Sequence, residues 1–122
     1  MSEFFAVDGM TIDFVSSSDS GDLTITGSPS TKYKADGGGV YKNGTTVSVS
    51  NFENDNVQAG SGTGAFVATS TKNKAEGQFV LRENDQAILS GTGTNKNPPP
   101  ATLPFTSTIE ITDPNNTKVR GE

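Results

Sequence analysis

A six-residue motif that occurs three times constrains the fold of this 122-residue chain more than any other feature. Each copy reads Thr-Lys-x-basic-small-acidic, and the copies are TKYKAD (Thr31–Asp36), TKNKAE (Thr71–Glu76) and TKVRGE (Thr117–Glu122). A repeated unit of this size usually cannot bury its own apolar face and packs against its neighbours instead. Three copies are too few for a long solenoid, so the repeat predicts a closed arrangement with pseudo-three-fold symmetry.

The similarity between the copies extends beyond the motif. Aligned without gaps, Thr31–Asn51 and Thr71–Gly91 are identical at seven of 21 positions, where ordinary residue usage gives on the order of one or two. Leu23–Asp36 and Ile109–Glu122 also align, because both have a strand-like run ending in Ile-Thr, a four-residue link with a proline, and then the motif. We therefore predict one domain over residues 1–122, with repeat-related segments 23–51, 63–91 and 109–122.

Local signals throughout the chain are those of an all-β protein. No window places apolar residues at helical spacing over several turns, and 14 Gly and six Pro interrupt the sequence. Alternation of apolar and polar residues predicts half-buried antiparallel strands. The predicted strands are Met10–Val15, Asp22–Thr26, Thr45–Ser50, Gly64–Ser70, Gly77–Arg82, Gln86–Leu89 and Ser107–Thr112. With the repeat, they predict a small, cone-like, loop-rich β fold of short hairpins with pseudo-three-fold internal symmetry.

Three stretches rich in glycine or proline indicate turns and connections. Asn43-Gly44, between apolar flanks, is the strongest short hairpin signal in the sequence. Gly60–Phe66 lacks the Lys-Ser/Thr that follows a phosphate-binding loop, and predicts a hairpin turn or close backbone packing. Asn97–Phe105 contains four of the prolines and predicts a stiff, extended connector between the second and third units.

Composition argues against several classes of function. The absence of Cys and His removes disulfides, thiol and imidazole catalysis, and the usual zinc ligands. A net charge of −5 argues against nucleic-acid binding. The N-terminus has neither a basic segment nor a long apolar run, so neither a signal peptide nor a membrane span is predicted. Nothing pairs two carboxylates as acid and base or supplies a base to a nucleophile, so we expect no enzymatic activity.

Positive charge is concentrated in the motif, whose 18 positions hold six of the nine basic residues. As a strand, each copy would turn its first, third and fifth residues to one face and its charged residues to the other. One interpretation is a solvated face on which the acid of one copy pairs with a base of the next, at about 0–1 kcal/mol per pair. The other is a three-fold ring that docks onto a three-fold partner. The candidate docking residues are Thr31, Lys32, Lys34, Asp36, Thr71, Lys72, Lys74, Glu76, Thr117, Lys118, Arg120 and Glu122.

The sequence TKNKAEGQFVLRENDQAIL (Thr71–Leu89), followed by a glycine-rich turn and the proline-rich NKNPPPATLPF (Asn95–Phe105), resembles the PAAR-like proteins. These are the spike tips of contractile injection machines, which include type VI secretion systems, contractile phage tails and extracellular injection particles. The resemblance covers about Val40 to Glu122. It consists of a Lys-x-Lys-x-Glu-Gly strand, a short apolar run, an Asp-bearing turn and a basic strand near the end.

The resemblance implies a small β-rich cone whose blunt base caps a trimeric β-helical spike. It implies a structural role in membrane puncture, with one tip per trimer of a VgrG-like spike protein and a transient contact with the target membrane. Such a protein would be made in the bacterial cytoplasm, assembled at the tip of the particle, and ejected on firing. Because the sequence stops at Glu122, we expect a bare tip without a fused toxin domain.

Many members of the family hold zinc near the apex through His and Cys, and this chain has neither, so we expect no zinc and no other cofactor. The carboxylates of Asp19, Asp22, Glu53 and Asp55 are hard-cation ligands in kind. They lack the spacing of a calcium loop, which favours their interpretation as surface acids.

The alternative function is that of a small β-domain adhesin or ligand-binding module of a trimeric fibre. Self-association separates the two hypotheses. A fibre domain should trimerise by itself, whereas a pseudo-three-fold tip already contains its symmetry and should be a monomer.

Overall fold

The computed structural model describes residues 3–97 and 100–121. The fold is all-β, as predicted, and the described part contains no helix, so none that could cross a membrane. The strands are β1 (Glu3–Phe4), β2 (Thr11–Phe14), β3 (Ser20–Ile25), β4 (Lys34–Ala35), β5 (Gly38–Gly39), β6 (Thr46–Glu53), β7 (Val57–Val67), β8 (Lys74–Ala75), β9 (Gln78–Phe79), β10 (Gln86–Asn95), β11 (Thr102–Asp113) and β12 (Arg120–Gly121).

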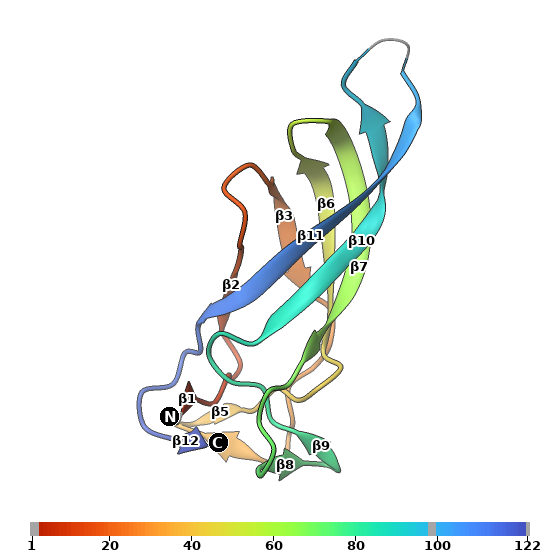
Figure 1. Ribbon diagram of the computed structural model, residues 1–122. Helices are drawn as coiled ribbons and strands as arrows, with labels where there is room; N and C mark the ends of the chain where they lie inside the picture. The colour runs from red at the N-terminus through yellow and green to blue at the C-terminus, as the bar shows by residue number, and fades with distance from the viewer. Residues whose placement is uncertain (1–2, 98–99, 122) are drawn as a thin grey trace.

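Six of these strands form one antiparallel sheet in the order β2-β11-β10-β7-β6-β3. The sheet curls into a nearly closed barrel, so that its edge strands β2 and β3 come into contact without forming a ladder. In chain order the barrel consists of three strand pairs, β2/β3, β6/β7 and β10/β11. The pairs rise side by side from the same end of the molecule, and the β10–β11 hairpin projects farthest (Figure 1).

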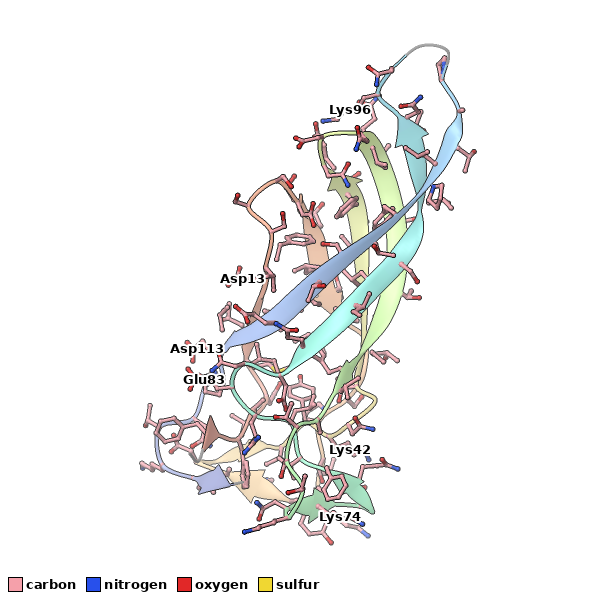
Figure 2. The ribbon with its side chains drawn as sticks, viewed as in Figure 1. Asp13, Lys42, Lys74, Glu83, Lys96 and Asp113 are labelled. Carbon is pink, nitrogen blue, oxygen red and sulfur yellow. The ribbon has the colours of Figure 1, made fainter. Side chains whose placement is uncertain are left out.

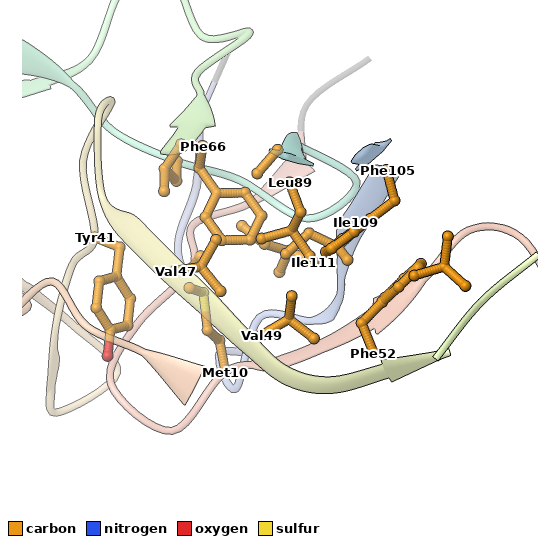
Figure 3. Close-up of a cluster of buried hydrophobic side chains, with 14 residues drawn as sticks. Met10, Tyr41, Val47, Val49, Phe52, Phe66, Leu89, Phe105, Ile109 and Ile111 are labelled. Atoms are coloured by element: carbon orange, nitrogen blue, oxygen red, sulfur yellow. The ribbon is translucent and has the colours of Figure 1, made fainter. Parts of the chain in front are cut away.

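Alternate residues of the barrel strands form its core (Figure 3). Val47, Phe66, Leu89 and Ile109 come from four different strands and are fully buried. Nearer the loops, the rings of Phe52 and Phe105 stack with centroids 4.0 Å apart. Each such side chain contributes about 1.5–3 kcal/mol when removed from water, so period-two alternation in the sequence specifies which face of the sheet turns inward.

Glycines allow strands β7 and β10 to approach each other closely. A Cβ on Gly62 would lie 2.5 Å from the carbonyl oxygen of Ser90, and one on Gly91 would collide with the carbonyl oxygen of Ser61. Glycine in a strand often marks such a close backbone approach or a sharp bend of a small barrel. Gly60–Phe66 therefore lies inside β7 with close backbone packing, as one of its two interpretations predicted, and the hairpin-turn interpretation is wrong.

Three small two-stranded sheets, β4-β5, β8-β9 and β1-β12, lie at the opposite end from the projecting β10–β11 hairpin (Figure 1). In the first two, the strands are joined by Asp36-Gly37 and Glu76-Gly77, with φ of 51° and 83°, and of 53° and 86°. Positive φ at both central residues is the type I′ pattern, which matches the twist of a tight hairpin. The third sheet joins the two ends of the chain, Glu3 facing Gly121 and Phe4 facing Arg120.

Each predicted strand overlaps an observed one, but several of the predicted bounds are wrong. β7 begins at Val57, seven residues before the predicted Gly64, and β10 and β11 are longer than predicted because their hairpin extends beyond the rest of the barrel. Within the predicted strand Gly77–Arg82, only Gln78–Phe79 belongs to a ladder.

The proline-rich stretch Asn97–Phe105 is not a connector between units, which corrects that prediction. Its described part is the loop and the returning strand of the β10–β11 hairpin, because the Asn95 amide donates to the Ala101 carbonyl at 2.8 Å and β11 begins at Thr102. The motif copies begin 40 and then 46 residues apart, and the larger second offset reflects the longer β10–β11 hairpin.

Candidate functional site

Three backbone hydrogen bonds form a closed cycle at the base of the barrel. The Tyr41 amide donates to the Ala6 carbonyl, the Ala6 amide to the Leu81 carbonyl, and the Leu81 amide to the Tyr41 carbonyl, each at 2.9 Å. Each residue is the donor to one neighbour and the acceptor for the other. The cycle therefore places three equivalent backbone segments around one axis, and this confirms the pseudo-three-fold arrangement. We call this set the central ring.

Around the central ring, the neighbouring residues repeat the same cyclic pairing. The antiparallel bridges are Val7–Val40, Lys42–Val80 and Phe5–Arg82. Because each unit pairs with the next in the same register, the three small sheets face the same end of the molecule. We call this end, formed by residues 3–7, 30–42, 70–82 and 116–121, the three-fold end.

Three equivalent turns lead from the central ring into the barrel. The turns Val7–Met10, Lys42–Thr45 and Arg82–Asp85 each carry a hydrogen bond from the last amide to the first carbonyl. Their third residues, Gly9, Gly44 and Asn84, have φ of 93°, 88° and 74°, the conformation that a type II turn requires there. Asn43-Gly44 is thus a turn, as predicted, but not a hairpin, because the segments on its two sides do not pair with each other.

Each motif copy begins after a buried polar residue that folds the chain into a tight turn. The hydroxyl oxygen of Ser30 accepts the amides of Lys32 at 3.2 Å and Tyr33 at 3.1 Å. Ser70 and Asn116 occupy the equivalent positions and are equally buried. Ser70 accepts the amide of Asn73 at 3.5 Å. Local side-chain acceptors of this kind compete with strand ladders for backbone amides.

This turn corrects the prediction that each motif copy is a two-faced strand. Among the described residues of the copies, only the fourth and fifth of each are in a strand, in β4, β8 and β12. Ala35 is buried, whereas Thr31 and Tyr33, predicted on the same face, are exposed.

The structure brings the candidate docking residues together at the three-fold end. Of the twelve, Arg120 is described by its backbone alone and Glu122 lies outside the described residues. The other candidates are exposed: Thr31, Lys32, Lys34, Asp36, Thr71, Lys72, Lys74, Glu76, Thr117 and Lys118.

A cavity of about 450 Å³ opens at this end, and we call it the axial basin. All three units contribute to its lining at equivalent positions. The apolar interior consists of Phe5, Val40 and Val80, followed outward by Tyr33, Asn73 and Val119, and the lysines of the lining are Lys32, Lys34, Lys72 and Lys74.

Acidic residues of the motif join neighbouring units. Asp36 accepts the Thr117 amide at 3.3 Å and lies 3.5 Å from the Lys118 ammonium. Glu76 lies 3.4 Å from the Lys42 ammonium of the preceding unit. A hydrogen bond from the Ser30 hydroxyl, with the added attraction of Lys42, holds the pKa of Glu76 below its ordinary value. The pairing of an acid of one motif copy with a base of another, which one interpretation predicted, is present between Asp36 and Lys118, whereas the partner of Glu76, Lys42, lies outside the motif.

The charge of the molecule is divided between its ends. The barrel segments 10–28, 45–68 and 85–113 contain eight Asp and Glu but one basic residue, Lys96, which lies far from Lys74 of the three-fold end (Figure 2). The described side chains of the motif copies include five Lys and two acids. The three-fold end is therefore basic although the chain is acidic.

Sequence reasoning missed the N-terminal residues that complete the third unit. Phe5 and Ala6 occupy the positions of Val40 and Tyr41 in the first unit. A signal for this exists in the sequence, because FFAVDGMTI (Phe4–Ile12) aligns with GVYKNGTTV (Gly39–Val47) and shares its glycine and a threonine. The third motif copy is at the C-terminal end of the sequence, whereas the segment that completes its unit is at the N-terminal end.

The four carboxylates considered as cation ligands are spread over the far end of the barrel. Asp19 accepts the Ser107 hydroxyl at 2.6 Å, Asp22 accepts the Asn51 amide at 2.9 Å, and Glu53 pairs with Lys96 at 2.7 Å. Among the residues that the structure describes, no three metal-ligating side chains gather at one point.

No protein-family model, curated protein or solved structure matches this chain.

Proposed function

We propose that this protein is the tip of a contractile injection apparatus and caps the end of a trimeric β-helical spike. The three-fold end is the base that docks onto the spike, and the β10–β11 hairpin points toward the target membrane. The observation that carries the proposal is the central ring of Ala6, Tyr41 and Leu81, by which a single chain presents three equivalent segments around one axis.

A symmetric trimer presents the same surface three times, and a single chain can satisfy all three only if it repeats its own surface three times. The motif copies do this at the level of the backbone, since the small sheets β4-β5, β8-β9 and β1-β12 surround the central ring. One chain on a trimer then closes the assembly, because at its opposite end the β10–β11 hairpin projects beyond the other two strand pairs and breaks the three-fold repeat (Figure 1).

The barrel suits a mechanical role. Its interior is filled by side chains of all six strands, and the stacked rings of Phe52 and Phe105 continue this core toward the loops. The strands β6, β7, β10 and β11 are eight to twelve residues long and run along the long direction of the molecule (Figure 1). Paired strands of this length resist bending more than separate loops would. The proposed tip therefore transmits force along its strands from base to apex.

Co-expression with the cognate trimeric spike protein tests the proposal. We expect a complex that survives size-exclusion chromatography, with one tip per three spike chains by native mass spectrometry. The protein by itself should sediment as a monomer. A protein that forms a trimer alone and no complex with the spike would favour the adhesin hypothesis and overturn this one.

Charge variants identify the docking end. The variant K32Q/K72Q/K118Q removes three charges from equivalent positions of the three-fold end. The control T24E/T63E/T106E changes the net charge by the same amount at exposed positions of the barrel. We expect the first variant to bind the spike at least about tenfold more weakly and the control to bind as the wild type does. The reverse result would assign docking to the barrel.

A further inference from the structure

Three flanks of the barrel, each next to the three-fold end, occupy equivalent places but differ in chemistry. Each flank is formed where one strand pair meets the next, by β3 with β6, β7 with β10, and β11 with β2. The first residues after the three equivalent turns, Thr46, Gln86 and Thr11, fix which positions correspond. The outward positions are Thr24, Thr26, Thr46 and Ser48 on the β3-β6 flank, Ala65, Val67, Gln86 and Ile88 on the β7-β10 flank, and Glu110, Thr112, Thr11 and Asp13 on the β11-β2 flank.

The β7-β10 flank exposes apolar side chains where the other two flanks have hydroxyls and carboxylates. Val67 and Ile88 are 65% and 64% exposed, and their counterparts on the β3-β6 flank are Thr26 and Ser48. Because the fold forms with polar side chains at these positions in two flanks, it does not require apolar ones in the third. An exposed apolar patch that the fold does not need marks an interaction site.

Val67 and Ile88 border a cavity of about 410 Å³, which we call the flank hollow. Its other described lining residues are Ala65, Thr69, Asn84 and Gln86, none of which is charged. Within the described part of the chain, the carboxamides of Asn84 and Gln86 are not hydrogen-bonded to other groups of the protein. A carboxamide offers two N–H donors and an acceptor oxygen, which complement the C=O and N–H of a peptide group. The equivalent turns have glycine at the position of Asn84, so this feature too is particular to the β7-β10 flank.

The uncharged surface continues from the flank hollow along both strands. Ser61 and Thr63 of β7 and Ser90 and Thr92 of β10 are exposed and carry hydroxyls or no more than a methyl beside them. From Ser61 to Val67 the surface extends about 20 Å along β7. A narrow, uncharged surface of this length suits an extended chain better than a compact ligand.

We infer that this surface binds an uncharged, extended peptide segment of a protein partner. An apolar side chain of the segment fills the flank hollow between Val67 and Ile88, and its backbone N–H and C=O groups bond to the carboxamides of Asn84 and Gln86. One of the three flanks has this chemistry, so each chain binds one segment. The described linings of the flank hollow and the axial basin share no residue. The segment therefore leaves the three-fold end free, and the inference does not rest on the proposed function.

A blocked tripeptide tests the chemistry of the flank hollow. Acetyl-Ala-Leu-Ala-methylamide has one large apolar side chain, four amide groups and no charge. We expect it to bind at least about tenfold more tightly than the same peptide with Lys or Glu at the centre. An analogue with esters in place of the amides keeps the leucine side chain, loses the N–H donors and should bind about threefold to tenfold more weakly. Titrations followed by NMR measure the affinities, and shifts of the Val67 and Ile88 methyl signals locate the site.

Variants that copy residues from the other flanks separate the apolar contact from the hydrogen bonds. V67T/I88S gives the β7-β10 flank the hydroxyls of the β3-β6 flank, and N84G/Q86T replaces both carboxamides by the residues of the other flanks. Both variants should fold, because the other flanks fold with these residues. We expect the leucine peptide to bind at least about tenfold more weakly to the first variant and about fivefold more weakly to the second.

The matched control is T26V/S48I, which places the apolar pair on the β3-β6 flank without carboxamides and should still bind one peptide per chain. A second site of equal affinity in this control would overturn the role of the carboxamides. Equal binding of the leucine, lysine and glutamate peptides, or unchanged binding by V67T/I88S, would overturn the inference. Self-association of the wild type that V67T/I88S abolishes would overturn the peptide as the occupant, because the flank would then bind a second copy of this chain. None of these variants alters the three-fold end, so the spike complex tests the proposed function separately.

Discussion

The position before each motif copy is occupied by serine or asparagine, with the same role. Ser30, Ser70 and Asn116 all accept backbone amides of the motif that follows them. The Asn116 carboxamide oxygen accepts the amides of Lys118 at 2.9 Å and Val119 at 3.1 Å, as the hydroxyl of Ser30 does in the first unit. Its nitrogen also donates to the Phe5 carbonyl at 3.1 Å. In the first unit the backbone amide of Ser30 makes the corresponding bond to Val40. The larger side chain thus joins the two ends of the chain.

We expect N116A to lower the free energy of unfolding by about 3 kcal/mol and S30A by about 1 kcal/mol, because Asn116 satisfies more buried backbone groups. Urea unfolding followed by circular dichroism measures both values. S18A, on an exposed loop, is the control and should change stability by less than about 0.5 kcal/mol. Equal losses for the two buried positions would contradict the role of Asn116 as a link between chain ends.

Ionisation of the Tyr41 phenol lowers the stability of the fold at alkaline pH. Burial, and secondarily the negative charge of Asp8, raises the pKa of its phenol above the ordinary value of 10.0. As pH rises, the unfolded chain therefore loses the phenolic proton at a lower pH than the folded chain does. The contribution of the protonated phenol to the free energy of unfolding is thus complete below about pH 10 and is lost as pH rises through the higher pKa of the folded state.

We expect the urea midpoint of the wild type to fall more steeply between pH 9 and 11 than that of Y41F, which has no such proton to lose. Ionisation of the lysines affects both proteins alike and cancels in the comparison. Parallel pH profiles would show that the Tyr41 phenol ionises equally easily in the folded and unfolded chain.

Among the elements, β7 and β10 depend on glycine in a way that their alternating pattern does not reveal. These strands are antiparallel neighbours in the sheet, and Gly62 and Gly91 face each other where a side chain would meet the backbone of the neighbouring strand. Gly37 is a different case. It has φ of 83° in the β4–β5 turn and open space around its missing side chain.

G91A should destabilise the protein by about 3 kcal/mol, because its Cβ would collide with the Ser61 carbonyl and the strands must separate. G37N should cost less than about 1 kcal/mol, because asparagine tolerates the left-handed conformation and nothing obstructs it. Thermal unfolding of both variants measures the difference. A tolerated G91A would mean that the two strands are not held at this separation.

The whole molecule has three units, one of which is assembled from both ends of the chain. β1 pairs with β12 in the third sheet as β4 pairs with β5 in the first, so the N- and C-termini lie together at the three-fold end (Figure 1). In the second unit, the turn Glu76-Gly77 joins β8 to β9. In the third unit the equivalent strands β12 and β1 are paired but are not joined by a turn, because they belong to opposite ends of the chain.

A circular permutant that begins at Gly77, with residues 122 and 1 joined by a short glycine linker, should therefore fold. We expect its free energy of unfolding to lie within about 2 kcal/mol of the wild type, since the same contacts form and one closed turn replaces another. A permutant opened inside β10, between Ser90 and Gly91, is the control and should not fold stably. Failure of the Gly77 permutant alone would show that the units are not interchangeable.

Much of the fold could be predicted from residues close together in the sequence. Alternation in stretches such as Thr45–Ser50 predicts strands because side chains on a strand face opposite sides in turn. Three copies of one motif predict three-fold symmetry because equal segments make equal contacts. The composition, with no His and no Cys, excludes disulfides and any role for an imidazole or a thiol side chain.

Only the tertiary structure decided how the candidate site is assembled. The central ring, the axial basin and the third unit arise from contacts between distant residues, and Asn116 and Phe5, which hold the third unit together, are 111 positions apart. The motif itself turns instead of extending, because the hydroxyl of Ser30 binds amides that a strand would have used. Local pattern specifies the elements, whereas Ser30, Ser70 and Asn116, which become buried only in the tertiary structure, bind amides of the motif and determine where its strand begins.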